Sequence, residues 1–419
     1  MHLLIRQARV VAPGSEFHDQ IVDLLIQDGI IINIGKDITA PDARLLEAEG
    51  LCVSPGFVDV FADYREPGFE HKETIASGLD CAAVGGFTHV LVAPNTHPAT
   101  TSKAAVQYLL KKAHGHAVSL HPLGAVTRDI EGKALAEMMD MHGNGAIAFT
   151  DGWKPVQNSN LMLKALEYLN AFEGTVIQIP ADAALSEGGL MHEGPVSTRL
   201  GMAGIPVLAE TILLHRDIEL LRYTGSHLHV TGISSAAGVD MIRRAKAEGL
   251  NITCSVTPYH LALNDEVLTT YNSHYKVNPP IRSEADRQAL VAGLADGTID
   301  CIASHHRPQE WDAKAKEFEY ASDGMNVQEM AFSIAYDAVN GAVPLERLID
   351  AIAVRPRQIL GLPGGGISAQ AQADICIFVT GTQNTVERPR SLSANNPFIG
   401  KSFSTRVLGI VNNGKYTIN

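Results

Sequence analysis

Residues 52–66 read CVSPGFVDVFADYRE, and this stretch carries the pattern that decides the fold. An apolar run with β-branched residues covers 52–60, and polar side chains follow directly after it. Seven more runs of this kind occur along the chain, with helical stretches between most of them. Such runs are typical of strands buried on both faces of a parallel sheet. The eight predicted strands are 52–60, 88–93, 117–121, 146–150, 175–179, 226–232, 251–256 and 299–304.

Eight strand–helix units over roughly 300 residues predict an α/β fold of the (β/α)8 TIM-barrel type. An open doubly wound sheet is the alternative, but no GxGxxG follows the first strand. The two chain ends differ, because they hold short strand-like segments and hairpin turns at Asp28-Gly29 and Asn413-Gly414. We expect a small β-sandwich domain from residues 1–54 plus 366–419, and a barrel over 55–365. The end segments predicted as strands are 2–11, 22–27, 30–34, 366–378 and 406–417.

Composition narrows the class of protein. The chain has 419 residues, of which 45% are hydrophobic and 19% charged, so a large core is expected. Its net charge is -13 and it has no run of Lys or Arg, which argues against nucleic acid or an anionic membrane as partner. The five cysteines include no CxxC pair, which argues against a disulfide framework. Without a signal peptide or a long apolar run, we expect a cytoplasmic protein.

Polar residues follow several of the predicted strands. In a barrel of this type, the active site lies at the C-terminal ends of the strands. These positions are therefore the candidates for chemistry. They are Phe61, Asp63, Arg65 and Glu66 after the first strand, Asn95, Thr96 and His97 after the second, Asp151 after the fourth, Pro258 and His260 after the seventh, and His305, His306 and Arg307 after the eighth.

Seven segments along nearly the whole chain together resemble one protein family. They are PGFVDVFADYREPGFEHKETIASG (55–78), VAPNTHP (92–98), AFTDGWKPVQ (148–157), EGPVSTRLGMAGIP (193–206), KVNPPIR (276–282), DGTIDCIASHH (296–306) and NNPFIGKSF (395–403). In this order they resemble the dihydroorotase family, and more narrowly its type I branch in the amidohydrolase superfamily. The resemblance implies a place in pyrimidine biosynthesis. It also implies hydrolysis or closure of the dihydroorotate ring with one or two zinc ions.

The resemblance also implies where zinc ligands should stand, and most of them are missing. Asp151 matches the ligand carboxylate after the fourth strand. The acid that serves the family as ligand and general base aligns with His305. The four family histidines align with Phe61, Asp63, Ile179 and Gly232.

The residues that bind the substrate in the family are better matched in this chain than the zinc ligands are. Arg65, Asn95 and Asn278 match the residues that hold the dihydroorotate carboxylate and ring in the family. His305 stands at the position of the family base, but we assign it no catalytic role.

Two hypotheses follow. In the first, the chain is a noncatalytic member that needs no cofactor and assembles with aspartate transcarbamoylase, as zinc-free members of the family do; a homodimer is also expected from the resemblance. In the second, it is a zinc-dependent dihydroorotase or related cyclic amidohydrolase. Asp63, Asp151 and His305 would then form a rebuilt mononuclear site. We favour the first, because phenylalanine, isoleucine and glycine donate nothing to a metal.

Three other features have simpler interpretations. Ser304 stands beside His305, but adjacent residues of a strand point to opposite faces, which argues against a serine–histidine pair. His229 is expected to lie in the core or at a helix interface. His260 is expected to pack or hydrogen-bond near the barrel mouth.

Overall fold

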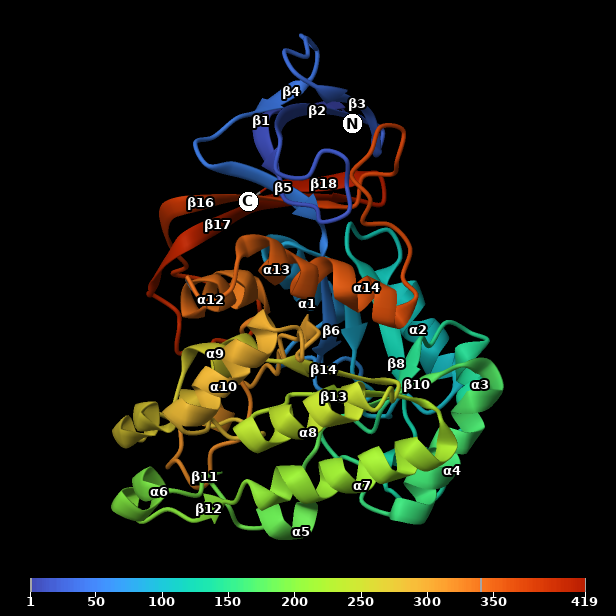
Figure 1. The fold of residues 1–419 in the computed structure, drawn as a ribbon, viewed down its shortest axis with the longest axis vertical. Coiled ribbons are helices and arrows are strands. Elements are labelled where there is room, and N and C mark those ends of the chain that lie inside the picture. The colour runs from blue at the N-terminus through green and yellow to red at the C-terminus, as the bar shows by residue number, and fades with distance from the viewer. Residues whose placement is uncertain (1, 340, 419) are drawn as a thin grey trace.

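The computed structural model describes residues 2–339 and 341–418, and its centre is a parallel sheet of eight strands (Figure 1). The strands pair in the order β15-β14-β13-β10-β9-β8-β7-β6. A parallel bridge between Ala62 and His306 joins the two outer strands, so the sheet closes nearly into a barrel. The predicted barrel is confirmed. Its strands are β6 (Phe57–Ala62), β7 (Phe87–Val92), β8 (Ser119–Gly124), β9 (Ala148–Phe149), β10 (Thr175–Gln178), β13 (His227–Thr231), β14 (Ile252–Val256) and β15 (Cys301–Ile302).

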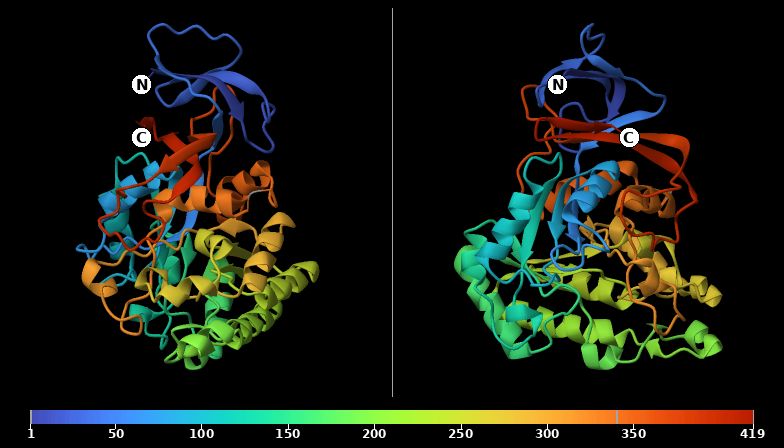
Figure 2. Two further views of the ribbon diagram at one scale, coloured as in Figure 1. Left: turned by 90° about the vertical axis from the view of Figure 1, so that its left-hand side faces the viewer. Right: turned by 180° about the vertical axis from the view of Figure 1, so that it is seen from behind.

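Helices cover the outside of the barrel (Figure 2). Several begin where a Ser, Thr or Asn side chain accepts a backbone N–H of the first turn, as at Ser102, Asn158 and Ser235. No helix among residues 2–339 and 341–418 is long and apolar enough to cross a membrane. The longer helices are α1 (Ile75–Val84), α2 (Lys103–Ala113), α4 (Ser159–Leu169), α7 (Leu208–Thr224), α8 (Ala236–Ala247), α10 (Glu284–Ala295) and α12 (Ala331–Ala338). The shorter ones are α3 (Met138–His142), α5 (Ala183–Ser186), α6 (Pro195–Leu200), α9 (Pro258–Ala262), α11 (Trp311–Lys314), α13 (Leu345–Ile349) and α14 (Arg355–Leu360).

Both ends of the chain meet in a second sheet, which lies at the top of Figure 1. It runs β18-β17-β16-β5-β1-β2-β3, with β4 paired to β1. The hairpins predicted at Asp28-Gly29 and Asn413-Gly414 are confirmed, and all four residues have positive φ, as such turns require. The strands are β1 (His2–Val10), β2 (Ile21–Gln27), β3 (Ile30–Gly35), β4 (Arg44–Leu46), β5 (Leu51–Pro55), β16 (Ile375–Thr385), β17 (Ser402–Asn412) and β18 (Lys415–Ile418). A two-stranded sheet of β11 (Met191–His192) and β12 (Gly204–Ile205) stands apart.

Several predicted strands were wrong in their extent, and two of them affect how the sheets are connected or bounded. The run 52–60 is divided at Gly56 into β5, which belongs to the end sheet, and β6, which opens the barrel. A Cβ at Gly56 would lie 2.2 Å from the Thr88 hydroxyl oxygen, so only glycine lets the chain pass between the sheets here. The run predicted at 366–378 begins as a strand only at Ile375.

A buried ion pair ties the end sheet to the barrel at this crossing. Arg357 donates from Nη2 to Asp374 Oδ2 at 2.7 Å and to Thr88 Oγ1 at 3.1 Å. Its Nη1 donates to the Gly56 carbonyl at 2.5 Å. Since Asp374 precedes β16 and Thr88 lies in β7, this network joins the two sheets at the end of the barrel opposite its mouth.

Candidate functional site

Aromatic and apolar side chains fill the barrel mouth. Phe61 lies in β6, Ile179 follows β10, and both are buried in one hydrophobic cluster that includes Trp153 at its edge. The Phe61 and Trp153 rings meet edge to face with centroids 5.1 Å apart. We call Phe61, Trp153, Ile179 and His305 the Trp153 plug. Two positions at which the resemblance places histidine ligands therefore hold packed apolar side chains.

His305 completes the plug and is buried. Its ring lies 4.9 Å from that of Phe61 and 5.3 Å from that of Trp153, centroid to centroid. Its Nε2 hydrogen-bonds with Thr231 Oγ1 at 2.8 Å. Burial lowers the pKa of His305 well below its usual value, so the imidazole is neutral. A neutral, buried ring that is bonded to a threonine and packed against two aromatic rings suits packing better than proton transfer.

Gly232 leaves room for the His305 ring. Gly232 has φ +75°, and a Cβ there would lie 2.5 Å from Cε1 of His305. A side chain at 232 would therefore force the His305 ring to move. The resemblance aligns Gly232 with a histidine ligand after the sixth strand, so His305 lies next to a position where the resemblance implies a ligand.

Asp63 is fully buried, and its two carboxylate oxygens are engaged. Oδ1 accepts the backbone N–H of Arg65 at 3.0 Å, and Oδ2 accepts the Trp153 indole N–H at 3.0 Å. Arg65 Nη1 lies 3.2 Å from the same Oδ2. Asp63 thus anchors the Trp153 plug and neutralises one arginine.

Asp151 is directed toward the backbone of a neighbouring loop. Its Oδ1 accepts the backbone N–H groups of Val126 at 3.0 Å and Thr127 at 2.9 Å. The Thr127 hydroxyl donates to Oδ2. Burial raises the pKa of Asp151 to about 6. This carboxylate holds the loop after β8 in place.

These residues do not fit a zinc site. A catalytic zinc ion takes about three protein ligands that converge on one open position. Within residues 2–339 and 341–418, no three His, Cys, Asp or Glu side chains are placed to hold a metal ion. Asp63, Asp151 and His305 face Trp153, Thr127 and Thr231 respectively. The rebuilt centre that the second hypothesis requires is therefore not formed by the described residues.

A cavity of about 520 Å³ lies beside the plug, and two of the three predicted substrate residues line it. Arg65 and Asn95 are in its wall, whereas Asn278 is not. The Asn95 amide is already engaged: Oδ1 accepts the Trp153 backbone N–H at 3.2 Å, and Nδ2 donates to the Asp151 carbonyl at 3.0 Å. Asn95 therefore positions the Trp153 loop.

Arg307 also lines this cavity, and the sequence did not indicate a role for it. Its Cζ lies 4.5 Å from the centroid of the Trp153 ring, a cation–π contact. The only signal in the sequence was its place directly after the last predicted strand. Nothing in that position indicates the stacking, which depends on a loop more than a hundred residues earlier.

The contacts of Ser304, His229 and His260 agree with what the sequence predicts for these three residues. Ser304 donates to the buried Asp59, while His305 meets Thr231, so the two do not pair. His229 is buried in the core between Thr253 and Ser255, and His260 hydrogen-bonds near the mouth with Thr257 and the Pro280 carbonyl.

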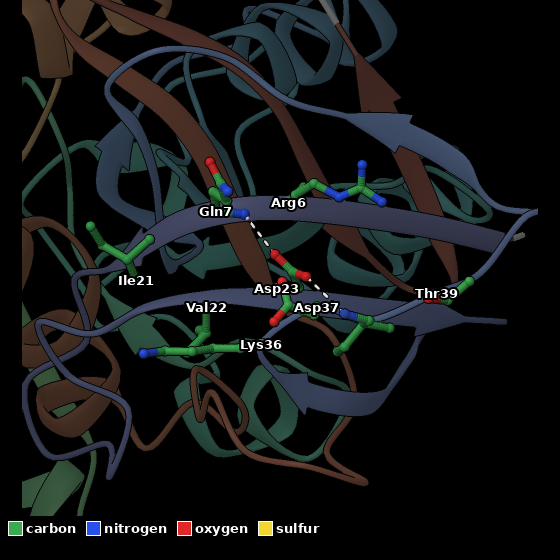
Figure 3. Close-up of a pocket in the computed structure, with 9 residues that line it drawn as sticks. Arg6, Gln7, Ile21, Val22, Asp23, Lys36, Asp37 and Thr39 are labelled. Atoms are coloured by element: carbon green, nitrogen blue, oxygen red, sulfur yellow. Dashed lines mark hydrogen bonds between the residues drawn. The ribbon is translucent and has the colours of Figure 1, made fainter.

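A second cavity, of about 510 Å³, lies in the end sheet (Figure 3). Its buried carboxylate, Asp23, accepts the backbone N–H of Gln7 at 2.8 Å and of Ile38 at 3.0 Å. Gln7 has φ 51° and stands where the pairing of β1 with β2 shifts register. Asp23 therefore supports a β-bulge, and we assign the cavity no chemistry.

A family model and two sequence relatives indicate the same family. A family model described as dihydro-orotase-like matches residues 50–237. The chain is 41% identical to a dihydroorotase of Syntrophus aciditrophicus, over 97% of each chain, and 40% identical to one of Citrifermentans bemidjiense, over 99% of each. Among solved structures it resembles L-hydantoinase (dihydropyrimidinase) from Arthrobacter aurescens, with TM-score 0.87 and 23% identity over 100% of this chain and 96% of the other.

Replacing Trp153 tests the plug. Trp153→Ala removes the indole bond to Asp63 and the ring contacts with Phe61 and His305. We expect it to lower the free energy of unfolding by about 3 kcal/mol, measured by urea denaturation. Trp311→Ala is the matched control, because Trp311 is 79% exposed and its loss should cost less than about 0.5 kcal/mol. Equal effects of the two substitutions would contradict a structural role for Trp153.

The pKa of Asp151 gives a second test. A carboxyl group whose pKa is raised to about 6 in the folded protein favours folding when protonated. The unfolding free energy of the wild type should therefore fall, relative to Asp151→Asn, as pH rises from about 4 to about 6. The change should be at most about 3 kcal/mol, measured by urea unfolding across this range. A zinc-bound carboxylate has a lowered pKa, so the opposite slope in the presence of zinc would refute our description of Asp151.

Proposed function

Because the chain belongs to the dihydroorotase family, we propose that it keeps the family's barrel without its zinc-dependent hydrolysis and serves as a noncatalytic partner of aspartate transcarbamoylase. The observation that carries this proposal is the Trp153 plug. Phe61 and Ile179 occupy ligand positions with packed apolar side chains, and His305 fills the space beside Gly232. A fold kept without its chemistry is kept for its surface or for what it binds.

The chemistry of amide hydrolysis explains why the loss of the ligand set matters. Zinc lowers the pKa of bound water from 15.7 to about 7, which eases deprotonation by about 12 kcal/mol. Without zinc, the chain itself must supply either a nucleophile or a base that activates water. Ser304 donates its hydroxyl to Asp59, and His305 is a neutral ring bonded to Thr231. Ser304, Asp59 and His305 are all buried, and neither Ser304 nor His305 lines the cavity beside the plug, so neither is placed as a nucleophile.

A cyclic amidohydrolase remains the second candidate function. One observation favours it: Arg65 and Asn95, which match the family's substrate residues, still line a cavity at the barrel mouth. Among residues 2–339 and 341–418, no three His, Cys, Asp or Glu side chains are placed to hold a metal ion, and the Asn95 amide is engaged by the Trp153 loop. The two candidates therefore differ in one measurable property, the hydrolysis of dihydroorotate.

Dihydroorotate hydrolysis is the direct test of the noncatalytic proposal. The purified chain is assayed with added zinc beside Arg65→Ala, with the Syntrophus aciditrophicus relative as positive control. We expect no rate above that of Arg65→Ala, because no group supplies an activated water. A rate that disappears in Arg65→Ala would establish a working site and reject the noncatalytic proposal in favour of the second candidate.

Association with aspartate transcarbamoylase tests the partner proposal. The chain is mixed with the transcarbamoylase of its own organism and separated by size exclusion with light scattering. We expect the two proteins to elute together with a mass above that of either alone. Separate elution at micromolar concentrations would reject the partner assignment. The run of the chain alone measures whether it forms the homodimer that the family resemblance implies.

A further inference from the structure

We propose that residues 311–322, in the loop after β15, form a pH-sensitive flap that is closed over residues 273–276 while Lys314 is neutral and detaches when Lys314 is protonated. We call residues 311–322 the Lys314 flap. It is independent of the proposed function, because it concerns the conformation of one loop and not the chemistry of the barrel mouth.

The two ends of the Lys314 flap are fixed by the buried side chain of Asn395. Its Oδ1 accepts the backbone N–H of Gln309 at 2.9 Å, just before the flap. Its Nδ2 donates to the Gly324 carbonyl at 3.0 Å, just after the flap. Gln309 Nε2 also donates to the Asp323 carbonyl at 2.6 Å, which draws the two ends together. The segment between these fixed points can therefore move as one unit.

Two buried lysines hold the body of the flap in its closed position. Lys276 Nζ, from the segment beneath, donates to the flap carbonyls of Phe318 at 2.9 Å and Glu319 at 2.8 Å. Lys314, in the flap, donates from Nζ to the Ser322 carbonyl at 2.8 Å and to the Lys276 carbonyl at 3.3 Å. Every one of these acceptors is a neutral backbone carbonyl. The amino groups are therefore bonded but their charges are not neutralised.

The surroundings of Lys314 disfavour a charge on it while the flap is closed. The residue is 3% exposed, and no carboxylate forms an ion pair with it within the part of the chain that the structure describes. Burial is the main cause that lowers the pKa of Lys314 from its ordinary value of 10.5 to about 7. Asp323 opposes this shift, whereas Arg307 and Lys276 add to it by repulsion.

The other titratable groups around the flap do not reverse this preference. His274 and Glu310 line a cavity of about 260 Å³ together with Lys314. Burial, with the charge of Lys314, lowers the pKa of His274, so this ring supplies no negative charge. The Glu310 carboxylate lies 3.0 Å from Lys72 Nζ and is neutralised there. Burial also lowers the pKa of Lys276, so the second lysine acts in the same direction as the first.

The direction of the switch follows from these preferences. Lys314 binds its proton more weakly in the closed flap, where its pKa is about 7, than in water, where it is 10.5. Protonation therefore favours the open flap, in which water hydrates the ammonium group. The ratio of open to closed flap should rise about tenfold per pH unit as pH falls from about 10 to about 7, and should level off below.

Opening would expose Phe318, the apolar anchor of the flap. This side chain is 4% exposed and packs in a cluster with Met191, Val196 and Leu268, all of which lie outside the flap. The burial of the ring favours the closed flap at high pH, where it is not opposed by a charge on Lys314. Exposure of the Phe318 ring therefore reports the open state.

Oxidation of the Phe318 ring by hydroxyl radicals measures this opening. Its rate is determined by mass spectrometry on the full chain from pH 9 to pH 7, and is divided by the rate at Tyr223, which is 78% exposed. We expect the ratio to rise by about tenfold per pH unit as pH falls, until most of the flap is open. A ratio that stays constant between pH 9 and pH 7 would overturn the proposal, and this outcome requires no variant.

Variants assign the effect to one lysine. Lys314→Met keeps an apolar chain but removes the titrating group, so oxidation of Phe318 should no longer depend on pH. Lys314→Arg stays charged over this range and should give fast oxidation at every pH. Lys316→Met is the matched control, because Lys316 lies in the same flap and is exposed, and it should behave as the wild type. An unchanged pH dependence in Lys314→Met, or its loss in Lys316→Met, would contradict the role of Lys314.

Discussion

The hydrogen bond from the Trp153 indole to the buried Asp63 carboxylate organises the barrel mouth. It holds the ring against Phe61 and His305, and Arg307 stacks on a face of the same ring. Without this bond, Asp63 would be a buried charge with Arg65 as its main partner, and the indole N–H would lack an acceptor. A buried polar pair of this kind is costly to break. The packing of the barrel mouth therefore depends on this hydrogen bond.

Several of the positions at which the family resemblance implies ligands are packed together. Gly232 leaves room for the His305 ring, and that ring packs on Phe61 and Trp153. Asn95, which the family resemblance assigns to substrate, instead holds the Trp153 backbone. Phe61, Trp153 and His305 contact one another, so the mouth is a packed structure in its own right.

Much of the fold could be predicted from the sequence, because buried parallel strands read as continuous apolar runs. The division of the run 52–60 could not, since it depends on the approach of Thr88 to Gly56. The sequence already showed apolar residues at positions where the family resemblance implies metal ligands. The contacts that replace them were not, because Trp153, Arg307 and Asp63 meet only after three different strands have been brought to one end of the barrel.

Zinc binding at the mouth is the property that separates a packed plug from a working metal centre. Anomalous diffraction at the zinc edge, from crystals grown with zinc, measures it without relying on turnover. We predict no zinc peak within coordination distance of Asp63, Asp151 or His305, and a Trp153 ring in contact with Phe61. A zinc ion coordinated by those three side chains, with the ring displaced, would contradict the account.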